Sequence, residues 1–211
     1  TTHLVTGGDR FFREALAVDL VDDSDTNLEV APVLFAKGVA SKGQESANQV
    51  QLVGVTPAFW KFAPSPMELN LENSKVAINS LLSERLGIER GDTLIVRFQK
   101  PGVVAGNAPV AGADQSLQSI RCEVGTILND SSFGRFSLET TQVPQASVFL
   151  PIEVLQKAFE FEERANLLLL RTNETVEDIQ LVLSRKVNLL DYQLNVEWLS
   201  EAKAWEIKSE R

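Results

Sequence analysis

LSERLGIERGDTLIVRF (82–98) predicts a helix end, a tight turn and a buried strand in direct succession. Asn79 lies just before the helical segment and is expected to cap it, and Gly87 suits the left-handed position that follows a helix. Gly91 accepts the unusual backbone of a tight turn, and the Asp92 carboxylate can accept hydrogen bonds from backbone N–H groups of that turn. The charges in this stretch also invite a catalytic interpretation, but each residue already has a role in folding. We therefore expect Gly87, Gly91 and Asp92 to be structural turn residues.

The elements expected around this stretch are strands and helices in mixed order, which predicts an α+β fold. Val50 and Leu52 alternate with polar neighbours, and the two strands before the stretch are expected to form a hairpin with a loop at 42–47. Thr175 and Asp178 have the spacing of a capping box. Strands are expected at 27–41, 48–57, 74–78, 92–98, 119–128, 135–143, 146–150, 165–172 and 192–199, and helical segments at 9–20, 58–62, 79–87, 151–161 and 175–187.

The composition argues against several classes of site. The net charge of −9 disfavours a nucleic-acid partner, because phosphate binding needs a local surplus of Lys and Arg. His3 is the only histidine and Cys122 the only cysteine, so we expect no His-dependent triad, disulfide or thiolate zinc site. The longest apolar run, NLLLL (166–170), is far shorter than the ~20 residues that span a bilayer. We expect no catalytic, cofactor-binding or metal-binding residues.

Three local patterns allow a functional interpretation beside a structural one. The acidic pair and arginine of EER (162–164) could act as a general acid with a partner, but a charged helix end explains them more simply. The serines of DSSFGRF (130–136) lack an activating base, and a turn in which Gly134 adopts positive φ accounts for this segment. The aromatic residues of AFWKF (58–62) could form a binding platform, although anchoring of a helical turn in the core is the commoner case.

The segment 101–116 is rich in Gly, Ala and Pro and is the longest expected loop. Long loops in compact domains are often functional, so this loop is the candidate for contact with a partner. Deletion of 103–113 is expected to leave thermal stability nearly unchanged and to impair function. The candidate contact residues are Pro101, Gly102, Val103, Val104, Asn107, Pro109 and Val110.

Several phrases of the sequence, taken together in their order, resemble the extracytoplasmic domain of FtsX/MacB/LolC-type ABC transporter permeases. These phrases are VQLVGVTPAFWKF (50–62), KVAINSLLSERLGIERGDTLIVRF (75–98), SSFGRFSL (131–138), QASVFLPIEVLQKAF (145–159) and RANLLLLR (164–171). The resemblance covers roughly residues 48–190. The loop at 101–116 departs from the pattern, so the resemblance assigns it no role.

The resemblance implies a two-lobed domain without enzymatic activity. A porter-like α/β lobe would be discontinuous, built from 1–69 and 146–211, and a β-rich, Sabre-like lobe would be inserted at 70–145. No catalytic residues and no cofactor are implied. ATP would be hydrolysed by a cytoplasmic subunit or domain, and the energy would move this domain outside the membrane, a process called mechanotransmission. Members of the family drive efflux, release lipoproteins or regulate cell-wall hydrolases.

The same resemblance implies the partners and the location. The chain is expected to be a piece of a longer inner (cytoplasmic) membrane protein, with this segment in the periplasm. Its partners would be its own transmembrane helices, a cytoplasmic ABC ATPase, a second permease subunit in a dimer and a periplasmic protein. No nucleic acid is expected.

Two alternatives from other classes stay open. The Leu-Gly-Ile…Gly-Asp turn is also similar to the GD-box of small interlocked β-barrels, which suggests a cytosolic module that binds nucleic acid or protein. A hydrolase with paired carboxylates would require two Asp or Glu side chains to converge in a pocket, with a raised pKa.

Overall fold

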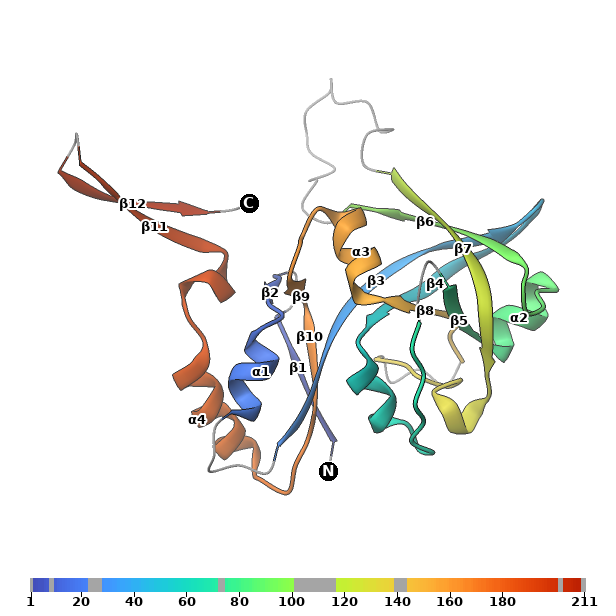
Figure 1. Ribbon diagram of the computed structural model, residues 1–211, viewed down its shortest axis with the longest axis horizontal. Coiled ribbons are helices and arrows are strands. Elements are labelled where there is room, and N and C mark those ends of the chain that lie inside the picture. The colour runs from blue at the N-terminus through green and yellow to red at the C-terminus, as the bar shows by residue number, and fades with distance from the viewer. Residues whose placement is uncertain are drawn as a thin grey trace. The chain divides into compact units, whose positions relative to one another are not determined.

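The structure is a computed structural model that describes residues 2–7, 10–22, 28–71, 75–100, 117–138, 144–200 and 203–209 (Figure 1). The chain is a sheet-rich mixture of strands and helices, which agrees with the predicted α+β class. It divides into two compact units, one formed by Thr1–Pro32 and Glu163–Arg211 and the other by Val33–Glu162. None of the helices in the described ranges is both long and apolar enough to cross a bilayer.

The first unit combines antiparallel strand pairs with helices α1 and α4 (Figure 1). β1 pairs with β10, so that Leu4 lies opposite Leu169, β2 pairs with β9, and β11 pairs with β12. α1 contacts α4, and Leu16 and Ile179 are buried on these two helices. The elements are β1 (Thr2–Thr6), β2 (Phe12–Arg13), α1 (Leu16–Val21), β9 (Arg164–Ala165), β10 (Leu167–Arg171), α4 (Val176–Lys186), η3 (Leu189–Tyr192), β11 (Leu194–Leu199) and β12 (Ala204–Ser209).

The second unit is built on a closed ring of strands (Figure 1). The strand order is β3-β4-β8-β5-β7-β6, and β6 pairs back with β3. Pairs β4–β8 and β5–β7 are parallel and the other pairs are antiparallel. Each of these six strands therefore has a neighbour on both sides, and none lies at a free edge of the ring. The elements are β3 (Glu29–Lys42, which begins in the first unit), β4 (Glu45–Val55), η1 (Pro57–Phe62), β5 (Lys75–Asn79), α2 (Ser80–Leu86), β6 (Thr93–Gln99), β7 (Leu117–Leu128), η2 (Asp130–Ser132), β8 (Ser147–Pro151) and α3 (Ile152–Phe159).

The ring closes where Gly38 of β3 lies opposite Phe98 of β6. A Cβ atom at Gly38 would lie 2.5 Å from the carbonyl oxygen of Arg97, a distance at which the backbone has to move. The register between β3 and β4 also shifts between Gly38 and Ala40, which marks a bulge at this point. Glycine is therefore required for the close approach of the two backbones.

The aromatic turn η1 lies in the core of the second unit. Phe59 and Trp60 are 0% and 1% exposed, so the core interpretation of these residues is confirmed. The Phe59 ring lies 4.5 Å from Phe133, 5.3 Å from Phe136 and 5.9 Å from Phe149, measured between ring centroids. Edge-to-face and tilted packing of this kind adds to the free energy gained from burial.

Asn79, which the sequence indicates only as a helix cap, is a buried junction. Its Oδ1 accepts hydrogen bonds from the backbone N–H groups of Leu82 and Ser147, both at 3.1 Å. Its Nδ2 donates to the carbonyl oxygens of Gly134 at 2.9 Å and Gln145 at 2.7 Å. These four bonds use the full capacity of the amide group. The predicted cap is confirmed, and the same side chain also joins β5 to β8 and to the turn after η2.

Of three other local predictions, one is confirmed and two need correction. Thr175 and Asp178 form the expected capping box. The helix predicted at 9–20 is too long, because Phe12–Arg13 pairs with β9 as strand β2 and the helix begins only at Leu16. The hairpin loop predicted at 42–47 is also too long, since β3 and β4 continue to Lys42 and Glu45 on either side of a tight turn with Gly43 at φ 60°.

A third correction concerns the segment after η2. A strand was expected at 135–143, but residues 135–138 lie in a turn and bend, and the remaining positions fall outside the described residues. Phe133, with φ 66°, takes the left-handed conformation that was expected at Gly134. Gly134 is needed for a different reason, because a Cβ there would lie 2.5 Å from the backbone of Asn129.

The division into units does not coincide with the lobes expected from the sequence. The inserted lobe expected at 70–145 falls entirely within the second unit, Val33–Glu162. The expected lobe boundaries, and the porter-like and Sabre-like descriptions of the lobes, stay predictions.

Candidate functional site

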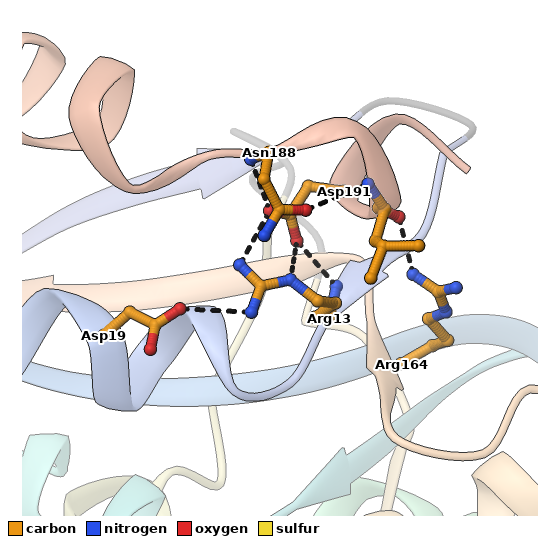
Figure 2. A network of polar contacts seen from close by, with 6 residues as sticks. Arg13, Asp19, Arg164, Asn188 and Asp191 are labelled. Carbon is orange, nitrogen blue, oxygen red and sulfur yellow. Dashed lines mark hydrogen bonds and ion pairs between the residues drawn. The ribbon is translucent and has the colours of Figure 1, made fainter. Parts of the chain in front are cut away.

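A polar network holds the 3-10 helix η3 of the first unit against strand β2 (Figure 2). The backbone N and side-chain Nε of Arg13 donate to Asp191 Oδ1 at 3.0 and 3.1 Å, and Arg13 Nη2 donates to Asp191 Oδ2 at 3.0 Å. The Asp191 side chain is 2% exposed, so this ion pair is shielded from water. Paired, charge-assisted hydrogen bonds of this geometry are among the strongest in proteins. We call this pair the Arg13–Asp191 clamp.

The Asp191 carboxylate is also held by hydrogen bonds within η3 and its N-terminal cap. Asn188 precedes η3, and its backbone N donates to Asp191 Oδ2 at 2.9 Å. Asn188 Oδ1 in turn accepts from the backbone N of Leu190 at 2.9 Å, which completes a capping box. With two bonds at each oxygen, the four acceptor positions of the carboxylate are occupied.

Two further contacts extend the clamp to neighbouring elements (Figure 2). Arg13 Nη1 donates to Asp19 Oδ2 of α1 at 3.1 Å, and Arg164 Nη1 of β9 donates to the Leu190 carbonyl at 2.7 Å. The hydrogen bond with Asp191 is the largest cause that raises the pKa of Arg13. The network therefore joins β2, α1 and β9 to η3, immediately before β11.

The bonding of the clamp indicates a structural role and not a catalytic one. The guanidinium stays protonated, and all acceptor positions of Asp191 are already used. The sequence did not indicate either residue as part of a site, because they lie 178 positions apart. The Asn188-x-x-Asp191 spacing, typical of a capping box, could have indicated a fixed carboxylate, but no local pattern identifies its partner.

The strands that follow the clamp form a hairpin with one exposed apolar side. Trp198 lies opposite Trp205 and Val196 opposite Ile207, which places these four side chains on one face. Their exposed fractions are 48%, 68%, 37% and 68%, in that order, and the two indole rings are 5.2 Å apart. We call Val196, Trp198, Trp205 and Ile207 the aromatic face. A strand over β11 is predicted from the sequence and one over β12 is not, although Trp205 and Ile207 alternate with charged residues there.

The Gly-Asp turn of the second unit is held by a lysine from β3. Asp92 Oδ2 accepts from the backbone N of Glu89 at 2.8 Å and from Lys42 Nζ at 2.6 Å, and these bonds, in that order of size, lower the pKa of Asp92. Lys42 Nζ also donates to the Gly87 carbonyl at 2.5 Å. Gly87 and Gly91 have φ of 57° and 90°, where a side chain would be strained.

The turn is also tied to the neighbouring strand β7. Gly91 N donates to the Val124 carbonyl at 2.8 Å, and Val124 N donates to the Asp92 carbonyl at 2.9 Å. The turn thus lies at the junction of α2, β3, β6 and β7. Its charged groups serve the turn and its connection to β3.

The remaining candidate residues lie apart from one another or outside the described structure. All seven residues proposed for partner contact, Pro101, Gly102, Val103, Val104, Asn107, Pro109 and Val110, lie outside the described residues, and their role stays a prediction. Cys122 is buried on β7, and burial raises the pKa of its thiol to about 12. Arg164, considered beside the acidic pair at 162–163, donates to the Leu190 carbonyl.

The described residues give no support to a site of converging carboxylates or of metal ligands. Four cavities have a single acidic residue each in their walls, namely Glu174, Glu153, Glu68 and Asp191. Within the described ranges, no group of three or more His, Cys, Asp or Glu side chains is placed to hold a metal ion.

Comparison with solved structures gives the fold. The periplasmic region of MacB from Actinobacillus actinomycetemcomitans matches 99% of this chain and 87% of its own length, with a TM-score of 0.57 and 13% identity. The chain has the fold of MacB-type extracytoplasmic domains. The extracellular domain of the ABC-type transporter YknZ from Gram-positive bacteria matches with a TM-score of 0.53 and 11% identity, covering 99% of this chain and 100% of that one.

The MacB-type fold agrees with the resemblance seen in the sequence. No protein-family model matches the sequence, and no curated protein sequence matches it. At 11–13% identity the similarity lies in the fold, and it extends over nearly the whole chain.

Proposed function

We propose that this chain is the extracytoplasmic domain of an FtsX/MacB/LolC-type ABC transporter permease. The observation that carries the proposal is the similarity in fold to the periplasmic region of MacB over 99% of the chain. The ordered phrases of the sequence support the same family. The domain is non-catalytic, because a cytoplasmic ABC ATPase hydrolyses the nucleotide and the permease helices transmit the resulting movement.

The clamp gives this domain a means of transmitting movement. A pull on the segment that follows η3 is transferred through Asp191 to Arg13, and from there to α1 through Asp19. A buried, multiply bonded ion pair resists extension better than an exposed one, because water cannot replace its bonds as they lengthen. The domain moves as part of a dimeric permease and contacts a periplasmic protein, with the loop at 101–116 as the candidate contact.

The location of the domain is tested by labelling a single introduced cysteine in cells that express the full-length protein. Ser46 is exposed at the start of β4, and S46C supplies a reactive thiol there. The wild-type chain is the matched control, since Cys122 is 4% exposed and its pKa is raised to about 12. S46C is expected to react with a membrane-impermeant maleimide in intact cells whose outer barrier is permeable to the reagent. Reaction only after lysis would support the cytosolic GD-box alternative instead.

The partnership with an ATPase is tested by purification of the full-length protein in detergent. A cytoplasmic ABC ATPase is expected to co-purify, and its rate of ATP hydrolysis is expected to change when it is bound to the permease. Purification without any ATPase from cells that express the neighbouring genes would contradict the proposal.

A further inference from the structure

The aromatic face is an exposed apolar surface on a hairpin that needs a partner. Trp205 and Ile207 are each 68% exposed, which is unusual for large apolar residues in a soluble domain. A two-stranded hairpin is only marginally stable alone, and three or more strands or a packed helix are normally needed. Among the described residues, β11 and β12 form a sheet of their own, and β11 contacts η3 (Figure 1).

The aromatic face is small for a stable interface with a second copy of the chain, which favours a different kind of partner surface. The two indoles together expose about 300 Å², taking ~250 Å² for a fully exposed indole side chain. Val196 and Ile207 add a smaller area. A stable protein interface buries about 800 Å² on each partner, well above what these four side chains offer. Binding to a lipid surface needs no fixed minimum area, because its strength scales with the apolar area that enters the surface.

The charges of the hairpin point to a neutral surface. Lys208 Nζ lies 3.1 Å from Glu197 and 2.9 Å from Glu206, so the charged groups of the opposite face pair with one another. The chain as a whole has a net charge of −9 and would be repelled by a strongly anionic membrane. Tryptophan prefers the headgroup region of a bilayer, where its ring is buried and its N–H stays close to water.

We propose that the aromatic face of Val196, Trp198, Trp205 and Ile207 docks on a zwitterionic lipid surface, with the two indoles at headgroup depth. This inference rests on the proposed function, which places the domain next to a bilayer. It adds that the hairpin contacts the lipid directly, and this contact restricts the movement of β11 and β12. The clamp lies immediately before this contact and connects it to the rest of the first unit.

The test uses the 211-residue chain with vesicles of phosphatidylcholine. Bromine-labelled phosphatidylcholine quenches tryptophan near the lipid, and Trp60, at 1% exposure in the core of the second unit, provides an unquenched reference. Wild-type protein is expected to co-sediment with the vesicles and to lose part of its emission. W198S/W205S is expected to bind at least 5-fold more weakly, and its remaining Trp60 emission should not be quenched.

The matched control removes an equally exposed apolar residue elsewhere in the first unit. Leu181 on α4 is 52% exposed, and L181S is expected to leave binding within 2-fold of wild type. Equal losses in L181S and W198S/W205S would overturn the proposal. So would the absence of quenching at any lipid concentration, or a dimer in sedimentation that W198S/W205S converts to monomer.

The vesicle experiment and the labelling of S46C test the lipid contact and the location of the domain independently. Reaction of S46C from outside together with no vesicle binding would overturn only the lipid contact. Vesicle binding that requires the two tryptophans supports the contact irrespective of the side on which S46C reacts.

Discussion

The ring of strands in the second unit and the hairpin β11–β12 of the first unit differ in how their strands pair and in where their apolar side chains lie. In the ring, six strands close on one another, and Leu34, Leu52, Ile78 and Leu94 inside the unit are fully buried. In the hairpin, two strands form a sheet of their own within the part of the chain that the structure describes, and their largest apolar side chains are exposed. The ring is stabilised by burial of its own residues, whereas the hairpin is attached through the polar clamp that precedes it.

The difference indicates which region carries the fold and which is available for function. Burial of apolar surface is the main source of stability, so a region that leaves tryptophans in water contributes little to folding. Its residues are then free to serve a contact outside the domain. Substitutions should therefore be costly in the ring, intermediate at the clamp and nearly neutral for folding in the hairpin.

Replacing one tryptophan in each region tests this comparison most strongly. Trp60→Ala is expected to lower the free energy of unfolding by about 3–5 kcal/mol, because it leaves a cavity in the aromatic cluster. Trp205→Ala is expected to change it by less than about 0.5 kcal/mol, since the side chain is 68% exposed. Urea denaturation followed by circular dichroism measures both. A loss below about 1 kcal/mol for Trp60→Ala would contradict the role given to the aromatic cluster in stabilising the second unit.

Two asparagines provide a second comparison of the same kind. Asn79→Leu removes four hydrogen bonds and leaves the N–H groups of Leu82 and Ser147 and two carbonyls without that partner, so we expect a loss of about 3–4 kcal/mol. Asn195→Leu, at an exposed position of β11, is the matched control and should stay within about 0.5 kcal/mol of wild type. Similar values in urea denaturation for the two variants would contradict the role given to Asn79.

The clamp is expected to be of intermediate strength. A double-mutant cycle with Arg13→Ala and Asp191→Ala should give a coupling energy of about 2 kcal/mol, because the pair is charge-assisted and Asp191 is buried. The exposed pair Glu197–Lys208 is the control, and its coupling energy is expected to be well below that of the clamp because solvent screens it. Faster trypsin cleavage after Lys203 in Asp191→Ala would show that the hairpin has been released. Equal coupling energies for the two pairs would argue against the clamp.

The smallest expected effect is a pH dependence at the Gly-Asp turn. The pKa of Asp92 is lowered from its usual 3.8, so the folded state favours the carboxylate. The resulting stabilisation is present above pH 3.8 and is lost as the pH falls through the lowered value. Wild type should therefore be more stable than Asp92→Asn at pH 7, and the two should converge in acid.

The control for this pH dependence is Lys42→Met. It removes the lysine but keeps the hydrogen bond from Glu89 N, which is the largest cause of the shift. Part of the dependence on pH should therefore persist in thermal melts of Lys42→Met. A constant difference between wild type and Asp92→Asn from pH 7 to pH 2 would contradict the assignment.

Most of the secondary structure could be predicted from the sequence, because its signals are local. Asn79, Gly87, Thr175 and Asp178 mark helix ends within a few residues of the groups that they bond or release. The error at 9–20 occurred where a distant partner decided the outcome. Phe12–Arg13 is a strand because it pairs with β9, although its apolar spacing is typical of a helix.

The candidate site was less predictable than the fold. The sequence indicated the Gly-Asp turn and argued against metal and His-dependent chemistry, but it did not identify the clamp or the aromatic face. Arg13 and Asp191 are ordinary surface residue types, and only their contact across 178 positions makes them a unit. The two tryptophans belong to a residue type that is highly buried on average, so residue type alone did not indicate their exposure.

The sequence by itself determined the helix caps, the Gly-Asp turn, the mixed order of elements and the resemblance to permease domains, because each depends on residues near one another in the chain. The tertiary structure decided the closure of the ring at Gly38, the four bonds of Asn79, the clamp and the exposure of the hairpin. Each of these depends on which backbones and side chains meet across long separations. Such long-range contacts are determined by the packing of the whole unit. No single segment of the sequence specifies them.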